Sequence, residues 1–263
     1  MARANRHYIP GHVWHITHRC HRRDFLLKFA KDRYRWLQWL LEARKRYGLL
    51  ILNYIVTSNH IHLLVCDSAG KDAIPRSIQL VAGRIGQEYN VRKGRQGAFW
   101  EDRYHATAIE SGKHLIQCLV YIDLNMVRAG VVKHPSDWKF GGYSEINYPR
   151  RKLRLIEHDR LMALVGVDTL AQLRDAHIGW VEEVLSKENL DRESMWTESI
   201  AVGSRHFAEI TMQQLGGLAK GRRLTGSDAP FELREPQAPY LDHFDPKNSN
   251  IGAKNTYSWD DNP

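Results

Sequence analysis

The chain has 263 residues, of which 43% are hydrophobic, enough to bury the core of one large domain or of a domain with an extension. It contains no run of roughly 18 apolar residues that could span a membrane, and no apolar segment typical of a signal peptide, so we expect a cytoplasmic protein. The formal net charge of +8 indicates a polyanionic partner, usually nucleic acid, because binding would release condensed counterions.

The first half of the chain alternates between strand and helix patterns. Alternating polar and apolar residues predict strands at Val13–Arg19, Leu49–Val56, His60–Cys66 and Tyr104–Glu110. Helical spacing predicts helices at Ala30–Tyr47, Ile74–Val91 and about Lys113–Arg128. This order predicts an α+β domain in which helices pack against an antiparallel sheet.

The second half is expected to be mainly helical. Helices are predicted at Asp159–Val165, Leu170–Ser186 and Arg205–Leu215. From residue 217 onward the composition shifts to Gly, Pro, Asp and Asn, which cannot bury a core, and we expect residues 217–263 to form a disordered acidic tail. Residues 149–216 are therefore expected to be a helical extension.

The three cysteines do not suggest a disulfide framework. Their number is odd and their spacing is not paired. Cys20 stands among histidines, so a zinc site is one interpretation, although the spacing differs from that of zinc modules. The alternative is a strand and turn that happen to be rich in polar residues. The residues concerned are Cys20, Cys66 and Cys118, with His12, His15, His18 and His21.

Positive charge is concentrated at the start of the chain. Residues 1–50 hold twelve Arg and Lys against three Asp and Glu, whereas the segment from Asp228 holds seven acids against three bases. A basic body with an acidic end suits binding to nucleic acid, and a solvated basic surface without a partner is the alternative.

Two histidines and a helix carry the residues with catalytic potential. His60 and His62 alternate with Ile61 on a predicted strand, so their side chains project to the same face, about 7 Å apart along the backbone, and can converge on one divalent ion. Tyr121 and Asn125 are four residues apart on a predicted helix and share a face. Beside a metal, Tyr121 would be a nucleophile and Asn125 an oxygen ligand. Without a metal, Tyr121 would be a half-buried aromatic residue and Asn125 an ordinary surface residue.

These motifs resemble those of a known family. The segment SNHIHLL at residues 58–64 resembles the histidine–hydrophobe–histidine signature of the HUH nucleases. The segment YIDLNMVRAGVV at residues 121–132 resembles the catalytic helix of the REP-associated tyrosine transposases, a group of single-tyrosine transposases in that superfamily. The match extends over residues 5–148 and includes FWEDRY at 99–104 and PSDW at 135–138. Ser58 and Met126 stand where relatives usually carry proline, which leaves the reacting groups unchanged.

The resemblance implies a specific enzyme. Residues 1–148 would form a ferredoxin-like catalytic domain that cleaves and rejoins hairpin-associated single-stranded DNA, like that of repetitive extragenic palindromes, through a 5′-phosphotyrosine intermediate. Tyr121 would be the nucleophile, and His60, His62 and Asn125 would hold Mg²⁺ or Mn²⁺, with Asn125 at a position where relatives often carry glutamine. The protein would act at the nucleoid as a monomer or homodimer.

Arginines and lysines near these motifs are candidate DNA contacts. They could clamp phosphates while neighbouring aromatic rings stack on unpaired bases. For each of them taken singly, an ordinary solvated surface group is the alternative. The candidates are Arg19, Arg22, Arg23, Arg92, Lys93, Arg95, Arg103 and Arg128.

Two other functions remain open from the sequence. One is a domesticated protein that binds hairpin DNA without strand transfer. The other is a metal-dependent nuclease in which water, rather than Tyr121, attacks the phosphodiester. A covalent protein–DNA adduct distinguishes the predicted transposase from both.

Overall fold

The computed structural model describes residues 9, 11–66, 72–149, 154–187, 190–219, 221–226 and 230–234. The α+β fold predicted from the sequence is confirmed. The elements of its first half, in chain order, are β1 (Val13–Arg19), the 3-10 helix η1 (His21–Arg23), α1 (Ala30–Tyr47), β2 (Leu50–Val56), β3 (His60–Cys66), α2 (Ala73–Lys93), β4 (His105–Ile109), α3 (Lys113–Asp123) and α4 (Asn125–Arg128).

These strands form an antiparallel sheet in the order β2-β3-β1-β4. The register of the central pair places Arg19 opposite His60 and Thr17 opposite His62. His15 is two residues from Thr17, so its side chain leaves the same face of the sheet as His62 and is its diagonal neighbour. The strand register alone therefore brings these polar residues close together.

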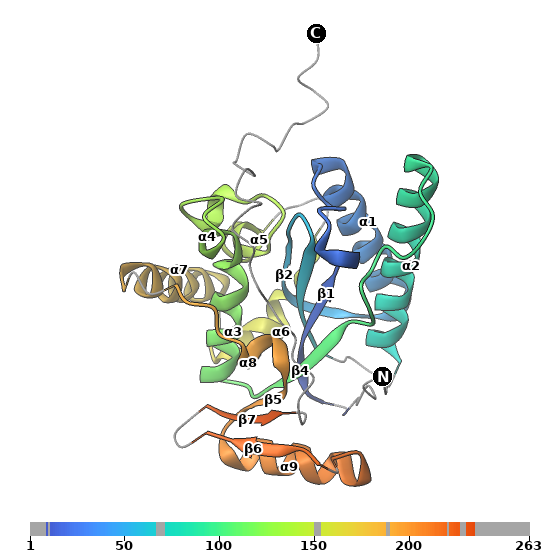
Figure 1. Ribbon diagram of the computed structural model, residues 1–263. Helices are drawn as coiled ribbons and strands as arrows, with labels where there is room; N and C mark the ends of the chain where they lie inside the picture. Colours follow the sequence, from blue (N-terminus) through green and yellow to red (C-terminus); the bar gives the residue numbers. More distant parts are fainter. Residues whose placement is uncertain are drawn as a thin grey trace.

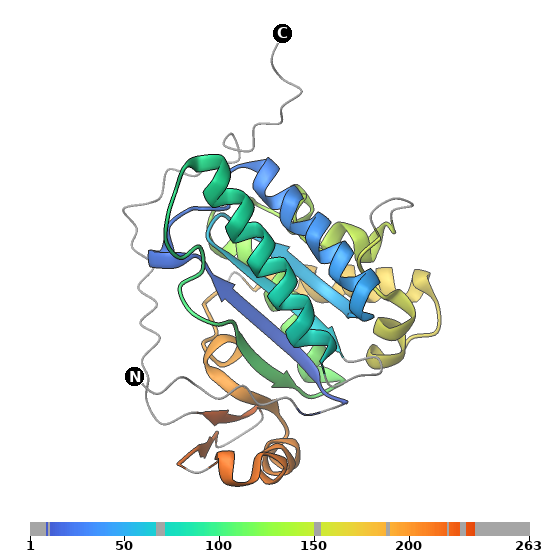
Figure 2. The same cartoon turned by 90° about the vertical axis from the view of Figure 1, so that its right-hand side faces the viewer.

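Helices cover both faces of the sheet. Helices α1 and α2 lie side by side on one face (Figure 2), and α3 lies on the other (Figure 1). Helix α1 buries Trp36, Leu37 and Leu40 at helical spacing and ends at Gly48, whose φ of 68° is a left-handed conformation that glycine adopts without strain. One face of the sheet is thus covered by α1 and α2, and the opposite face carries His15 and His62.

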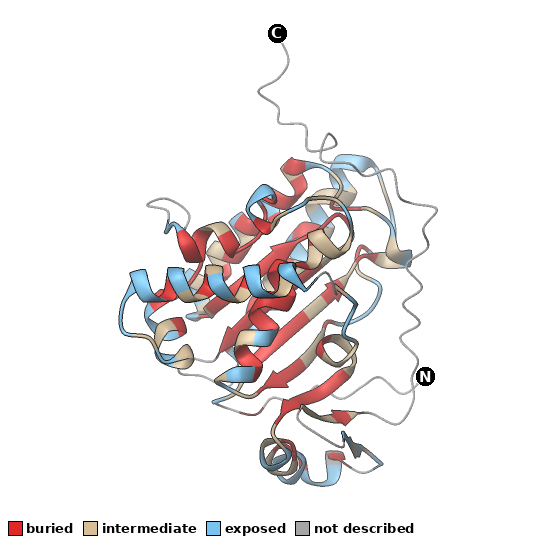
Figure 3. Ribbon diagram, turned by 90° about the vertical axis from the view of Figure 1, so that its left-hand side faces the viewer, coloured by how far each residue is buried: buried red, intermediate tan, exposed pale blue. Residues whose placement is uncertain are grey.

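The second half of the chain packs against the α3 face and extends the sheet. Figure 3 shows α7 with its exposed residues turned outward from the buried strands. The remaining elements are η2 (Pro135–Asp137), α5 (Tyr143–Asn147), α6 (His158–Val165), α7 (Leu170–Ser186), α8 (Met195–Glu198), β5 (Ser199–Gly203), α9 (Arg205–Leu215), η3 (Gly216–Ala219), β6 (Arg223–Thr225) and β7 (Phe231–Arg234).

The structure corrects two expectations for this half. Residues 149–216 are not only helical, because β5 pairs in parallel with β4 and continues the sheet. Part of the expected disordered tail also forms strands, since β7 pairs with β5, and β6 pairs with β7. The reason is that β4 leaves an open edge, and a sheet edge can order short strands that have little pattern of their own. Residues 235–263 lie outside the described part of the chain.

The cysteines and the helices were also compared with what disulfides and membrane spans require. Cys20, Cys66 and Cys118 are all buried and free. Among the described residues, no helix is both long enough and apolar enough to cross a membrane.

Candidate active site

His60 and His62 both point at Asn125. The amide nitrogen Nδ2 of Asn125 lies 3.0 Å from Nε2 of His62 and 3.4 Å from Nε2 of His60. The strand alternation of β3 and the position of Asn125 at the start of α4 bring these three side chains together across more than sixty residues of sequence. The grouping predicted from the sequence is therefore present in the fold.

The ring of His60 is oriented by its chain neighbour. Nδ1 of His60 lies 2.7 Å from Oδ1 of Asn59. An amide oxygen only accepts, so Nδ1 of His60 carries the proton and its Nε2 has the lone pair, which faces Asn125. Asn59 is itself held by the bond from its Nδ2 to the backbone oxygen of Arg23, 3.3 Å away. Arg23 belongs to η1, where it and Arg22 have positive φ values of 60° and 55°, rare for residues other than glycine.

The ring of His62 is almost entirely buried and contacts a second imidazole. Nδ1 of His62 lies 2.9 Å from Nε2 of His15, and Nδ1 of His15 donates to the backbone oxygen of Trp196 at 2.8 Å. Burial lowers the pKa of His15 to about 3, and burial together with the neighbouring His60 lowers the pKa of His62 well below its ordinary value. Both rings are therefore neutral at physiological pH and can offer lone pairs.

Tyr121 stands one helical turn before Asn125, beside the imidazoles. Its ring centroid is 5.9 Å from that of His62 and 6.1 Å from that of Trp196, and the guanidinium carbon of Arg128 lies 4.1 Å above the ring. Burial raises the pKa of Tyr121, whereas the positive charges of Arg128 and Arg192 and a hydrogen bond with Arg192 lower it in part. The local charges thus favour the phenolate that burial disfavours.

The helix predicted at Lys113–Arg128 is divided in the structure. Helix α3 ends at Asp123 and α4 begins at Asn125, with Leu124 at φ −79° and ψ 2° between them. Asn125 therefore begins a new helical turn. The guanidinium of Arg128 donates to the backbone oxygen of Tyr121, which bridges the break.

The donor set fits a hard or borderline divalent ion. The Nε2 lone pairs of two imidazoles face the side-chain amide of Asn125. Rotation of this amide by 180° would put its Oδ1 where its Nδ2 now lies, so that an oxygen would face the two imidazoles. Two nitrogens and one neutral oxygen suit Mn²⁺ and are tolerated by Mg²⁺, and they leave positions open for substrate. Among the described residues, no three His, Cys, Asp or Glu side chains are grouped so that they could hold a metal ion.

The predicted DNA contacts divide into two groups. Some are engaged within the protein: Arg92 pairs with buried Asp32, and Arg128 stacks on Tyr121. The others lie at the surface around the end of the sheet that carries His60. These are the exposed Arg22, Lys93 and Arg103 and the partly exposed Arg19, Arg23 and Arg95.

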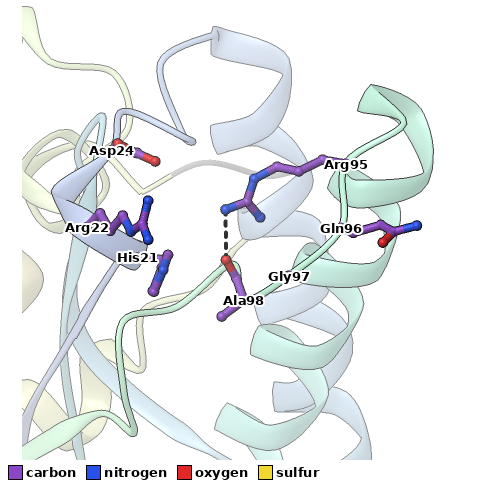
Figure 4. A pocket seen from close by; sticks show the side chains of 7 residues that line it. All are labelled: His21, Arg22, Asp24, Arg95, Gln96, Gly97 and Ala98. Atoms are coloured by element: carbon purple, nitrogen blue, oxygen red, sulfur yellow. Dashed lines mark hydrogen bonds between the residues drawn. The ribbon is translucent and has the colours of Figure 1, made fainter.

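A pocket of about 420 Å³ opens at this end of the sheet, between η1 and the loop after α2 (Figure 4). His21 and Arg22 line one side and Arg95 the other, where Nη2 of Arg95 donates to the backbone oxygen of Ala98 at 2.9 Å. Asp24 is the one acidic residue of its lining. The pocket thus presents guanidinium groups close to where β1 pairs with His60.

Sequence reasoning did not assign His15, Asn59, Arg192 or Trp196 to the site. The strand alternation of β1 could have placed His15 on the same face of the sheet as His62. Nothing in the sequence indicated that Arg192 and Trp196 would return to Tyr121, because their approach depends on the way β5 joins the sheet.

The comparison with protein-family models agrees with the motifs. Residues 9–125 match the model of a family described as "Transposase IS200 like". One similar solved structure is titled "Structure of the REP associates tyrosine transposase bound to a REP hairpin". It shares 24% sequence identity, covers 55% of this chain and 84% of that chain, and has a TM-score of 0.46. No curated protein matches the chain.

Proposed function

Because residues 9–125 match the model of the IS200-like transposases, we propose that this chain cleaves and rejoins single-stranded DNA beside hairpins, with Tyr121 as nucleophile and a divalent metal ion. The nucleophile and the metal ligands would lie within residues 1–148, and a chromosomal substrate would place the protein at the nucleoid. The observation that carries the proposal is the convergence of His60, His62 and Asn125 beside Tyr121.

The three ligand candidates would hold Mg²⁺ or Mn²⁺. Such an ion, when bound, polarises a phosphodiester and offsets the negative charge that repels a nucleophile. His60 and His62 supply neutral nitrogen ligands, because their Nδ1 protons are committed to Asn59 and to the contact with His15. Asn125 supplies a neutral amide, so the full charge of the ion remains available to the phosphate.

The covalent step uses Tyr121. Its hydroxyl oxygen bonds to phosphorus as the bond from phosphorus to the 3′ oxygen breaks. The phenolic proton leaves to solvent, and the departing oxygen takes up a proton, which yields a free 3′-hydroxyl and a 5′-phosphotyrosine. Attack by a 3′-hydroxyl on that phosphotyrosine reverses the step and joins strands without an external energy source. Arg128 and Arg192, whose positive charges favour ionisation of Tyr121, assist the attack.

The basic end of the sheet is the proposed DNA path. Arg22 and Arg95 line the pocket near the sheet end that carries His60, and exposed guanidinium groups bind phosphates of flexible single strands well. Two arginines in the pocket, against one acidic residue, leave it positive. A strand lying along this end would pass close to His60.

A denaturing gel tests the proposal. The substrate is a single DNA strand that contains a hairpin and is labelled at its 5′ end in one experiment and at its 3′ end in another. It is incubated with the protein and Mn²⁺ or Mg²⁺, and a parallel reaction contains EDTA. We expect a free 3′-hydroxyl fragment and a protein-linked 5′ fragment, and neither should form with EDTA. Binding without any cleavage would instead indicate the domesticated hairpin-binding protein, and cleavage without a protein-linked fragment would indicate attack by water.

A further inference from the structure

His15 lies behind His62, on the side away from Asn125. It is fully buried, and its two ring nitrogens face different partners: Nδ1 is 2.8 Å from the backbone oxygen of Trp196, and Nε2 is 2.9 Å from Nδ1 of His62. The two imidazoles are nearly parallel, with an interplanar angle of 11° and a centroid separation of 5.0 Å. This row of three groups ends at the candidate metal site.

The carbonyl at one end determines where the protons lie along the row. A carbonyl oxygen only accepts, so Nδ1 of His15 must carry a proton. Neither partner of His15 is negatively charged, so the buried ring stays neutral and its Nε2 has only a lone pair to offer. Nδ1 of His62 is then the donor between the rings. Because a neutral imidazole has one proton, Nε2 of His62 keeps its lone pair, directed at Asn125.

We propose that His15 is a positioning residue, which uses the backbone carbonyl of Trp196 to fix the tautomer and orientation of His62. His62 Nε2 is thereby ready to bind a metal ion without prior loss or rearrangement of a proton. This assignment rests on the proposed function, in which His62 is a metal ligand.

The carbonyl comes from outside the residues that match the transposase family. Trp196 belongs to α8, which packs against β1 and β4 (Figure 1). The chain is anchored here by Thr107 of β4, whose hydroxyl lies 3.2 Å from the backbone oxygen of Trp196 and 2.7 Å from that of Ser199. β5 begins at Ser199 and pairs with β4. The position of the carbonyl is therefore fixed by the extended sheet, and the second half of the chain completes the site.

Two substitutions separate the hydrogen-bonding role of His15 from its bulk. His15→Phe keeps a planar ring and removes both hydrogen bonds. His15→Gln keeps an acceptor oxygen as many bonds from Cβ as Nε2 is, so it can still accept the proton of His62. The matched control is His158→Phe, because His158 is equally buried and donates to the backbone oxygen of Glu145, 3.0 Å away in another part of the fold.

Two measurements on the full-length protein test the proposal. Nitrogen-15 NMR of the histidine rings, without metal, reports which nitrogen of each ring is protonated. Calorimetric titration with Mn²⁺ alone reports the affinity of the site. We expect His62 to be protonated at Nδ1 in the wild type and to lose this single tautomer in His15→Phe. The Kd for Mn²⁺ should rise about 10- to 100-fold, recover largely in His15→Gln, and stay unchanged in His158→Phe.

The outcomes separate this proposal from the function on which it rests. A wild type that binds no Mn²⁺ but has His62 protonated at Nδ1 contradicts the metal site and retains the tautomer assignment. If His62 is protonated at Nε2 in the wild type, the positioning role is wrong, whether or not any variant folds. The role is also wrong if His15→Phe binds Mn²⁺ as the wild type does, or if His158→Phe weakens binding equally.

Discussion

His177 and Asp123 are joined by a buried hydrogen bond of 2.8 Å between Nε2 and Oδ2, which links helix α7 to helix α3. The other oxygen of Asp123 accepts a bond of 3.0 Å from Asn53 of β2. Asp123 lies two residues after Tyr121 and two before Asn125, at the break between α3 and α4. The second half of the chain thus supports the segment that carries both site residues.

We expect His177→Leu to destabilise the protein substantially. The substitution fills most of the volume but leaves Oδ2 of Asp123 buried without its donor, which should lower the free energy of unfolding by about 3 kcal/mol. For a domain of this size the melting temperature should fall by roughly 10 °C. Thermal unfolding followed by circular dichroism measures this change.

The control for this substitution lies directly after the end of the same helix. Lys187→Met removes an exposed pair in which Lys187 contacts Glu183 at 2.6 Å. Surface ion pairs of this kind contribute little to the free energy of unfolding, so the melting temperature should not change measurably. Equal melting temperatures for His177→Leu and the wild type would contradict a structural role for the buried bond.

The regular elements of the first half could be predicted because their patterns are long. β1, α1 and β3 have the predicted bounds, since seven to eighteen residues of regular alternation or helical spacing identify one element type. β5 could not be predicted, because it has five residues, all buried, and no alternation. Its strand conformation comes from pairing with β4 and β7, which is a property of the tertiary fold.

The residues of the site also divide into those that local sequence patterns identify and those that only the tertiary fold brings together. His60, His62, Tyr121 and Asn125 occur in short local motifs, and strand and helix periodicity place them on shared faces. His15 and Trp196 are 181 residues apart, and their contact requires both the register of β1 and the path of the chain into β5. The break at Leu124 was also beyond prediction, because the sequence there continues a helical pattern.

The pocket beside η1 should contribute to DNA binding through charge. We expect Arg22→Gln to weaken binding of a single-stranded hairpin substrate several-fold at low salt. The slope of log affinity against log salt concentration should become shallower by about 0.7 for each phosphate that the variant no longer neutralises. Fluorescence anisotropy over a salt series, with a blunt duplex for comparison, measures both quantities.

A second arginine serves as the control for nonspecific effects of charge on DNA binding. Arg46 lies on α1 and pairs with Glu42 at 2.5 Å, so Arg46→Gln removes the same charge elsewhere on the surface. The wild-type slope should persist in this variant. If both variants weaken binding alike, net charge alone explains the effect and the pocket has no specific part in it.

Adduct formation should depend on pH through Tyr121. Burial holds its pKa above the ordinary value, so the phenol is protonated at neutral pH and the rate should rise as pH increases from 7 to 9. Arg192 lowers this pKa, and its removal in Arg192→Met should raise the pKa and slow the reaction. A change of one pKa unit corresponds to about tenfold at fixed pH. Single-turnover rates across this range test the prediction.

Arg205→Met is the control for Arg192→Met. Arg205 is exposed on α9 and pairs with Glu209 at 2.8 Å. Its rate profile should match that of the wild type. A profile for Arg192→Met that is lowered without any shift toward higher pH would assign Arg192 to DNA binding instead of to ionisation of Tyr121.

The decisive substitution is Tyr121→Phe. It removes one oxygen from a side chain that is otherwise packed against Trp196 and Arg128, so folding, Mn²⁺ binding and DNA binding should all persist. Covalent attack cannot occur without that oxygen, and the protein-linked 5′ fragment should disappear from the denaturing gel. His60→Ala should differ, because it should lower Mn²⁺ affinity together with the rate.

Two results with Tyr121→Phe would contradict the mechanism in different ways. An adduct that persists would mean that another tyrosine attacks, and Tyr104 is the first to examine, because it directly precedes β4, the strand that pairs with β1. Cleavage that continues without an adduct would mean that water attacks the phosphodiester. The energy of the broken bond would then be lost to hydrolysis, so the protein could cut DNA but could not rejoin it, and strand transfer would be excluded.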